Sequence, residues 1–194
     1  MIRKTNDELY HHGVKGQKWG VRRYQNYDGT RIGSKKKTVF ISGSSKTQFR
    51  DKNNPYYRKR LAKELKDEID KLIEENANIV VGDAPGIDRQ VQNYLNKKVY
   101  KNVEVYGPGK KVRYSANKQW KTNPIDSDYE PMSSEWLALK DIKMSEIATE
   151  GLAVILDEGA TATRNNIKRM NSMGKSVKVY ELNKNGKKHD HWNN

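Results

Sequence analysis

Five short, mainly apolar runs are spaced along the middle of the chain, and segments with a different hydrophobic pattern separate them. The runs, each predicted as a strand, are 38–42, 79–81, 103–106, 152–156 and 177–182. Between them, apolar residues recur every three to four positions, as on one face of a helix. The predicted helices are 57–76, 87–98, 134–149 and 163–173. Buried strands joined by helices predict a Rossmann-like, three-layer α/β/α fold with a mainly parallel, five-stranded sheet.

The two ends of the chain and one internal segment lack these patterns. Residues 1–37 are expected to form a flexible basic arm, residues 38–182 the folded domain, and residues 183–194 a disordered tail. Residues 108–133 are polar and contain prolines, and a connection of this length is usually a functional loop or a disordered one. Trp120 in this segment could stack on a nucleotide base or anchor the loop by packing.

The formal net charge of the chain is +14, but the charge is unevenly distributed. Residues 1–37 hold 10 Lys and Arg against 3 Asp and Glu, whereas residues 38–182 hold 25 against 20. The folded domain is therefore only mildly basic, which argues against a large nucleic-acid-binding surface on it. We expect no nucleic-acid partner and assign the basic character mainly to the arm.

Composition excludes several classes of protein. The chain has 0 cysteines, which excludes disulfides and thiolate catalysis. No apolar run approaches the roughly 20 residues of a membrane span, so no membrane partner is expected. The first residues are charged and polar, which predicts no signal peptide and a location in the cytoplasm. The histidines at 11–12 and at 189 and 191 lie in the expected flexible ends, so neither a metal nor a cofactor is expected.

Small and polar residues follow three of the predicted strands. They form the segments 43–46 (GSSK), 82–88 (GDAPGID) and 157–165 (DEGATATRN). The carboxyl ends of parallel strands share one edge of a sheet, and ligands bind there near the switch in strand order. The N–H groups at a helix start carry partial positive charge and suit phosphate. The three turns therefore predict one site for a nucleotide.

Most of these turn residues are candidates for nucleotide contacts: Gly43, Ser44, Ser45, Lys46, Gly82, Asp83, Gly86, Asp88, Thr161, Thr163, Arg164 and Asn165. Arg164 suits phosphate, because a guanidinium group can donate two parallel hydrogen bonds to it. Asp83 and Asp88 suit ribose hydroxyls, and together with Glu158 they are candidates for a catalytic acid or base. The alternative stays open that these residues only bend the chain and cap helices.

Residues 38–182 resemble the SLOG superfamily, a Rossmann-like group that includes cytokinin-activating phosphoribohydrolases, DNA processing protein A and ligand-sensing domains of antiviral systems. The resemblance rests on the order and spacing of the three turns, and on Lys140-Asp141 with Met144, where the superfamily often has an Arg-Asp…Met helix. The small bacterial and phage members are the most similar. The resemblance implies a nucleotide-binding domain that forms a homo-oligomer, since relatives often pair through helices flanking the site.

The third turn departs from the superfamily pattern. Glu158 stands in place of a glycine after Asp157, and Ala162 in place of the glycine before Thr163. The phosphoribohydrolases carry a glutamate after this threonine, thought to act at the glycosidic bond, and this chain has no match for it. The resemblance therefore supports nucleotide binding better than phosphoribohydrolase activity.

The arm contains a distinctive string at residues 11–24, HHGVKGQKWGVRRY. It resembles a short segment that recurs, attached to varied domains, in structural-module proteins of tailed phages. The resemblance implies a phage-encoded protein with a docking or processing signal. Trp19, Arg22, Arg23 and Tyr24 are the candidates for docking to a phage structural protein, because Trp, Tyr and Arg dominate interface hot spots.

Three functions remain open on the sequence alone. The leading interpretation is a protein that binds or sequesters a nucleotide or an NAD-derived signalling ligand such as ADP-ribose, with a counter-defence role. The second is a hydrolase of N-glycosidic bonds in nucleotides or NAD, in which a carboxylate assists departure of the base. The third is a virion structural or packaged cargo protein whose arm carries the function, which would place it in the virion.

Overall fold

The computed structural model of this chain describes residues 36–44, 63–155, 159–182 and 188–193, the last segment and residue 182 by their backbone alone. Contacts between Cα atoms divide the chain into two units, Met1–Lys36 and Lys37–Asn194. The basic arm thus falls almost wholly outside the described residues, and all the described helices and strands belong to the second unit.

The described residues of the second unit form a sheet of seven strands in the order β4-β3-β2-β1-β5-β6-β7. The strands are β1 Thr38–Gly43, β2 Asn78–Gly82, β3 Val103–Pro108, β4 Lys121–Ile125, β5 Glu150–Ile155, β6 Val177–Leu182 and β7 Lys188–Asn193. Neighbouring strands from β4 to β6 are parallel, and β7 alone pairs antiparallel, with β6. The mainly parallel sheet predicted from the sequence is confirmed.

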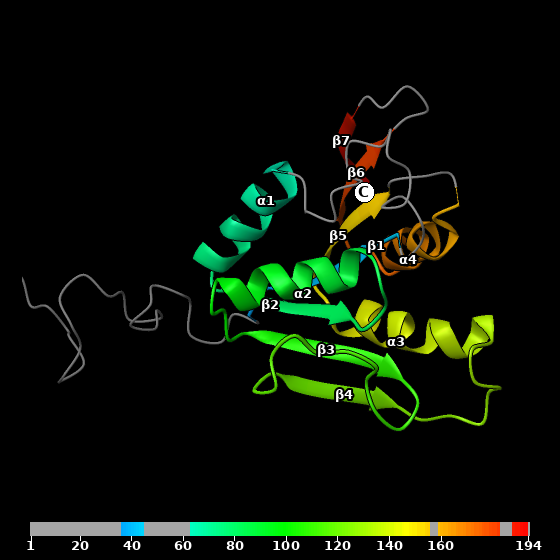
Figure 1. Cartoon of the computed structure of the whole chain (residues 1–194). Coiled ribbons are helices and arrows are strands. Elements are labelled where there is room, and N and C mark those ends of the chain that lie inside the picture. Colours follow the sequence, from blue (N-terminus) through cyan, green and yellow to red (C-terminus); the bar gives the residue numbers. More distant parts are fainter. Residues whose placement is uncertain (1–35, 45–62, 156–158, 183–187, 194) are drawn as a thin grey trace, which may run out of the picture. The chain divides into compact units, whose positions relative to one another are not determined.

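Helices cover both faces of this sheet (Figure 1). They are α1 Lys63–Glu74, α2 Ile87–Lys97, α3 Ser134–Ile147 and α4 Thr161–Ser172. Successive side chains of a strand point to opposite faces. Val39 and Ile41 of β1 accordingly pack with α1 and α2, whereas Phe40 packs with α3 and α4. The buried apolar residues thus form one cluster on each face of the sheet.

Two of the seven strands were not predicted. β4 lies within the segment expected to be a long loop, and its sequence Lys-Thr-Asn-Pro-Ile has no apolar run because it is an exposed edge strand. β7 lies within the expected disordered tail, where backbone pairing with β6 places it in the sheet. Trp120, just before β4, is 5% exposed and donates from Nε1 to the carbonyl of Tyr100, so it anchors the loop by packing.

The strand order fixes where a ligand site can form. The chain builds outward from β1 through β2 and β3 to β4, and then returns to the other side of β1 with β5 and β6. The switch in direction therefore lies between β1 and β5, where the crevice beyond the strand ends suits a ligand. The end of β1 meets the start of α2 closely, since a side chain on Gly43 would come within 2.5 Å of Ile87.

Candidate functional site

A cavity of about 330 Å³ lies at the carboxyl end of β1, beside the start of α4. Its walls come from β1, the turn before α2, and helices α2, α3 and α4. The lining residues are Phe40, Ser42, Gly43, Ser44, Ala84, Asp88, Lys140, Asp141, Gly159, Ala160, Thr161, Ala162, Thr163 and Asn166. The cavity lies beside the switch in strand order, where the sequence analysis expects a ligand site.

The start of α4 forms one wall of the cavity. Ala160 precedes the helix and supplies no side-chain cap, whereas Ser133 caps α3 by accepting a hydrogen bond from the Trp136 N–H at 3.1 Å. Thr163 is 2% exposed, and its hydroxyl makes no hydrogen bond to any residue that the structure describes. Buried hydroxyls normally have a partner. This wall therefore offers an unpaired hydroxyl and the positive end of a helix dipole.

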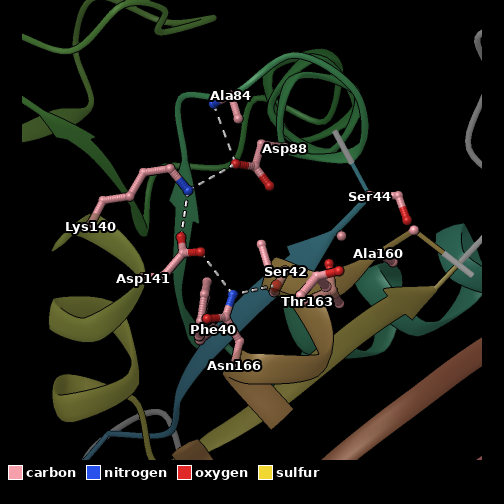
Figure 2. Close-up of a pocket in the computed structure, with 14 residues that line it drawn as sticks. Phe40, Ser42, Ser44, Ala84, Asp88, Lys140, Asp141, Ala160, Thr163 and Asn166 are labelled. Atoms are coloured by element: carbon pink, nitrogen blue, oxygen red, sulfur yellow. Dashed lines mark hydrogen bonds and ion pairs between the residues drawn. The ribbon is translucent and has the colours of Figure 1, made fainter. Parts of the chain in front are cut away.

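A buried charged cluster forms the opposite wall (Figure 2). Lys140 Nζ lies 2.5 Å from Asp141 Oδ1 and 3.6 Å from Asp88 Oδ2. None of these three residues is more than 7% exposed. Such charges are tolerated inside a protein only when they are paired. Because one ammonium group serves two carboxylates, the cluster has excess negative charge when all three groups are ionised, and the cavity has opposite polarity on its two sides.

Asn166 of α4 fixes the floor between these walls. Its Nδ2 donates to Asp141 Oδ2 at 3.0 Å and to Ser42 Oγ at 2.9 Å. One amide group thereby connects β1, α3 and α4. The carboxylate of Asp141 is held on both sides, by Asn166 and by Lys140, so its position at the base of the cavity is fixed.

Gly82 contributes to the site by lacking a side chain. A Cβ atom at this position would come within 2.2 Å of Asp88 Oδ2 and 2.7 Å of Lys140 Nζ. The glycine at the end of β2 therefore leaves room for the charged cluster, although it does not itself line the cavity. The contact of Gly82 with a nucleotide stays a prediction.

The proton affinity of Asp88 differs from that of an exposed aspartate. Burial raises the pKa of Asp88 from 3.8 to about 6, a rise that Lys140 opposes and Asp141 reinforces. The folded protein therefore holds this proton more tightly than the unfolded chain does. Consequently the free energy of unfolding falls as the pH rises from about 4 to about 6. Above that window the buried carboxylate is ionised, and its full destabilising effect is present.

Replacing Asp88 by asparagine is expected to raise the free energy of unfolding by about 2 kcal/mol at pH 7.5 and by much less at pH 4. The substitution removes the buried charge and leaves Lys140 paired with Asp141. Urea unfolding at the two pH values measures the effect. The exposed Asp126→Asn is the control and should change stability by less than about 0.5 kcal/mol. Equal effects of Asp88→Asn at both pH values would contradict the assignment.

The structure brings five of the predicted contact residues to the cavity: Gly43, Ser44, Asp88, Thr161 and Thr163. Five others are described but do not line it, namely Gly82, Asp83, Gly86, Arg164 and Asn165. Gly86 precedes α2 with a φ of 93°, a backbone conformation that favours glycine. The remaining candidates, Ser45, Lys46, Glu158, Trp19, Arg22, Arg23 and Tyr24, lie outside the described residues.

Asp83 and Arg164 are paired with other residues rather than turned to the cavity. Asp83 Oδ2 accepts hydrogen bonds from the backbone N–H of Arg113 at 2.8 Å and from its Nε at 3.0 Å, and Asp83 Oδ1 accepts one from Arg113 Nη2 at 2.5 Å. Asp83 thus ties the segment after β3 to the end of β2. Arg164 Nη2 donates to Glu181 of β6 at 2.6 Å. The expected phosphate contact by Arg164 therefore has no support in this geometry.

The cavity is also lined by four polar residues that the sequence analysis did not predict to bind a ligand: Ser42, Lys140, Asp141 and Asn166. Lys140-Asp141 was recognised as part of the superfamily pattern, but nothing in the local sequence shows that α3 buries these two charges. The helix is apolar on several sides, so its buried face cannot be read from its hydrophobic periodicity. The resemblance to the superfamily's Arg-Asp…Met helix is the signal that could have marked them.

Comparisons with known proteins identify the fold and leave the function open. A solved structure of DNA processing protein A from Helicobacter pylori, studied for its single-stranded DNA binding mode, is similar with a TM-score of 0.55. The two chains are 13% identical, and the match covers 77% of this chain and 67% of that chain. The likeness supports the Rossmann-like α/β fold. At this identity the similarity shows the fold alone.

The arm matches a different kind of family. A family of unknown function, DUF7211, matches residues 3–26, which include the string at 11–24. This match covers a small part of the chain and assigns no role to it. No curated protein matches the sequence. A phage origin, docking through the arm and homo-oligomer formation therefore stay predictions.

Two further features of the described residues concern membranes and metal ions. None of the described helices is long and apolar enough to cross a membrane. Within the same part of the chain, no three His, Cys, Asp or Glu side chains are grouped as metal ligands would be.

Proposed function

We propose that the cavity binds a nucleotide or a related phosphate-bearing nucleoside. The phosphate lies at the start of α4, and the sugar extends toward Asp88. The observation that carries this proposal is Thr163, a residue 2% exposed at an uncapped helix start, which lines the cavity and whose hydroxyl has no hydrogen-bond partner among the described residues. Phosphate oxygens accept hydrogen bonds from hydroxyl and backbone N–H groups, and the helix dipole stabilises their charge.

The polarity of the cavity supports a single orientation of such a ligand. A phosphate placed beside Asp88 and Asp141 would meet two carboxylates, whose one cationic partner is already engaged. At the start of α4 it would meet N–H groups and a hydroxyl. The volume of about 330 Å³ lies at the lower end of the range for small-molecule sites, about 300–1,000 Å³. A mononucleotide unit is therefore the part that we place within these walls.

Thr163→Val tests the proposal, because it keeps the shape of the side chain and removes its hydroxyl. We expect wild-type protein to be stabilised by at least one of AMP, NAD, ADP-ribose and cyclic ADP-ribose at millimolar concentration in a thermal-shift assay. A hydrogen bond to a charged group contributes about 1.5–3 kcal/mol, so Thr163→Val should weaken binding by at least tenfold in calorimetry. No stabilisation of the wild-type protein by any of these ligands would contradict the proposal.

Asn165→Ala is the matched control for this experiment. Asn165 lies two residues further along the same helix, is exposed and does not line the cavity. The substitution should therefore leave the affinity unchanged. Single-stranded DNA belongs in the same screen, because the similar protein from Helicobacter pylori binds it. Stabilisation by DNA and by no mononucleotide would favour a nucleic-acid-binding function instead.

A second candidate function, cleavage of an N-glycosidic bond, is favoured by Asp88. Burial raises the pKa of Asp88 to about 6, which is close to the value that suits a general acid near neutral pH. In this reaction Asp88 would protonate the base as the bond between C1′ and the base nitrogen breaks. Water would then add to C1′ and give its proton to the Asp88 carboxylate, which restores the acid. Chromatography of AMP or NAD incubated with the protein distinguishes the candidates, because only hydrolysis releases free base.

A further inference from the structure

We infer that Asp88 selects ribonucleotides, by accepting hydrogen bonds from the vicinal hydroxyls of a ribose whose phosphate lies at the start of α4. This inference rests on the proposed nucleotide binding and adds to it a preference for one class of sugar. It follows from the pairing of the two carboxylate oxygens of Asp88 and from the place of this residue across the cavity from Thr163.

The two oxygens of the Asp88 carboxylate have different surroundings. Oδ2 accepts a hydrogen bond from the Ala84 N–H at 3.3 Å and lies 3.6 Å from Lys140 Nζ. Oδ1 has no partner among the residues that the structure describes. Asp88 is 5% exposed and lines the cavity. A carboxylate oxygen can accept two hydrogen bonds, so Oδ1 has room for two donors from a ligand.

The chemistry around Oδ1 limits what the donor can be. A second anion is disfavoured there, because Asp88 and Asp141 flank the same ammonium group of Lys140. A metal ion would need more carboxylate or imidazole ligands than the described residues place together. Among the groups that a nucleotide carries, neutral hydroxyl or amide donors remain. In a 5′-nucleotide the 2′ and 3′ hydroxyls are the neutral donors nearest the phosphate, and the base lies further away.

Opposite walls of the cavity therefore match opposite ends of one ribose phosphate. Thr163 and the start of α4 suit the phosphate, and the free oxygen of Asp88 suits the hydroxyls. A deoxynucleotide bound in this orientation would leave Oδ1 with fewer donors or none. Leaving a buried carboxylate without hydrogen-bond donors is costly, so the loss of a hydroxyl should lower the affinity strongly.

Calorimetric titration with AMP, 2′-deoxy-AMP and 3′-deoxy-AMP tests the inference on the wild-type protein. We expect AMP to bind about ten- to a hundredfold more tightly than either deoxy analogue, as for a hydrogen bond to a charged group. In Asp88→Ala the three affinities should converge on the value of the deoxy analogues. Thr163→Val should weaken all three equally and keep the ratio, because it acts on the phosphate.

The outcomes separate the inference from the proposal on which it rests. Equal binding of AMP and both deoxy analogues to the wild-type protein would overturn the role of Asp88 while leaving nucleotide binding intact. A preference for AMP that persists unchanged in Asp88→Ala would also overturn it. Binding of none of the three would contradict nucleotide binding itself, and the inference with it. If Asp88→Ala does not fold, the wild-type ratio alone decides.

Discussion

Replacing Lys140 by methionine is expected to lower the free energy of unfolding by about 3–5 kcal/mol at pH 7. Lys140 is 6% exposed, and its ammonium group is the cationic partner of both Asp88 and Asp141. Methionine keeps most of the volume of the lysine stem but leaves two buried carboxylates without a cation. Removing one member of a buried ion pair is this costly because the remaining charge is uncompensated. Urea unfolding measures the loss.

The loss at Lys140 should grow as the pH rises. Without the ammonium group, the pKa of Asp88 rises beyond its already raised value, because an opposite charge no longer favours the ionised form. The folded state of the variant then takes up a proton more readily than the unfolded chain does. Acid therefore reduces the loss of stability, because protonation removes an uncompensated buried charge. The loss should be larger at pH 8 than at pH 5. An equal loss at both values would point to disturbed packing instead.

Lys143→Met is the matched control on the same helix. Lys143 Nζ lies 3.1 Å from Glu146 Oε2, but about half of each side chain is exposed. Ion pairs in such positions contribute between about 0 and 1 kcal/mol, so this variant should unfold almost as the wild-type protein does. If Lys143→Met lowered the free energy of unfolding as much as Lys140→Met does, the effect would come from placing methionine in α3 and not from losing the buried charge.

The second large effect is expected at Arg113. Arg113→Met should lower the free energy of unfolding by about 3 kcal/mol, the lower limit for breaking a buried ion pair. Asp83 has a side chain with 0% exposure and receives two side-chain hydrogen bonds from Arg113. The backbone N–H of Arg113 remains as a donor in the variant, and for this reason we expect the lower limit. Chemical unfolding monitored by circular dichroism measures the change.

Two further variants show whether the geometry of the Arg113 pair matters. Arg113→Lys should recover less than half of the loss, because an ammonium group cannot reproduce the two parallel hydrogen bonds of a guanidinium. Arg164→Met is the control, since the pair of Arg164 with Glu181 is 40% and 27% exposed and should contribute less than about 1 kcal/mol. Full recovery by lysine would contradict a bidentate role.

The parts of the fold that bury apolar side chains could be predicted from the sequence. β6 was predicted with its observed bounds, 177–182, and α2 within one residue of its end at Lys97. β4 could not be predicted, because an edge strand with Pro124 and exposed polar residues has no hydrophobic pattern. β7 is likewise held by backbone pairing with β6, which composition does not reveal. The hydrophobic pattern of a sequence identifies strands whose side chains are buried. It misses strands that are held only by backbone pairing with a neighbour.

The sequence said more about where a site is expected than about the residues that line the cavity. Turns that follow parallel strands share one edge of the sheet, and the cavity lies at that edge, beside the switch of strand order at β1. The contacts were harder to predict, because side-chain pairing depends on the tertiary structure. Arg164 is directed to Glu181 and Asp83 to Arg113, whereas Lys140 enters the site from a helix far along the chain. No local sequence rule shows which partner each charge will find.

The central place of β1 has a consequence for how the protein folds. β1 pairs with β5 in parallel, and the backbone N–H of Thr38 donates to Oγ1 of Thr149 across 111 positions of the chain. Pairing over such separations is slow, because a long loop must close before any contact compensates for its entropy. The cavity needs α3 and α4 as well as β1, so it is complete only after this closure. Ligand binding during refolding would therefore report a stage that follows this closure.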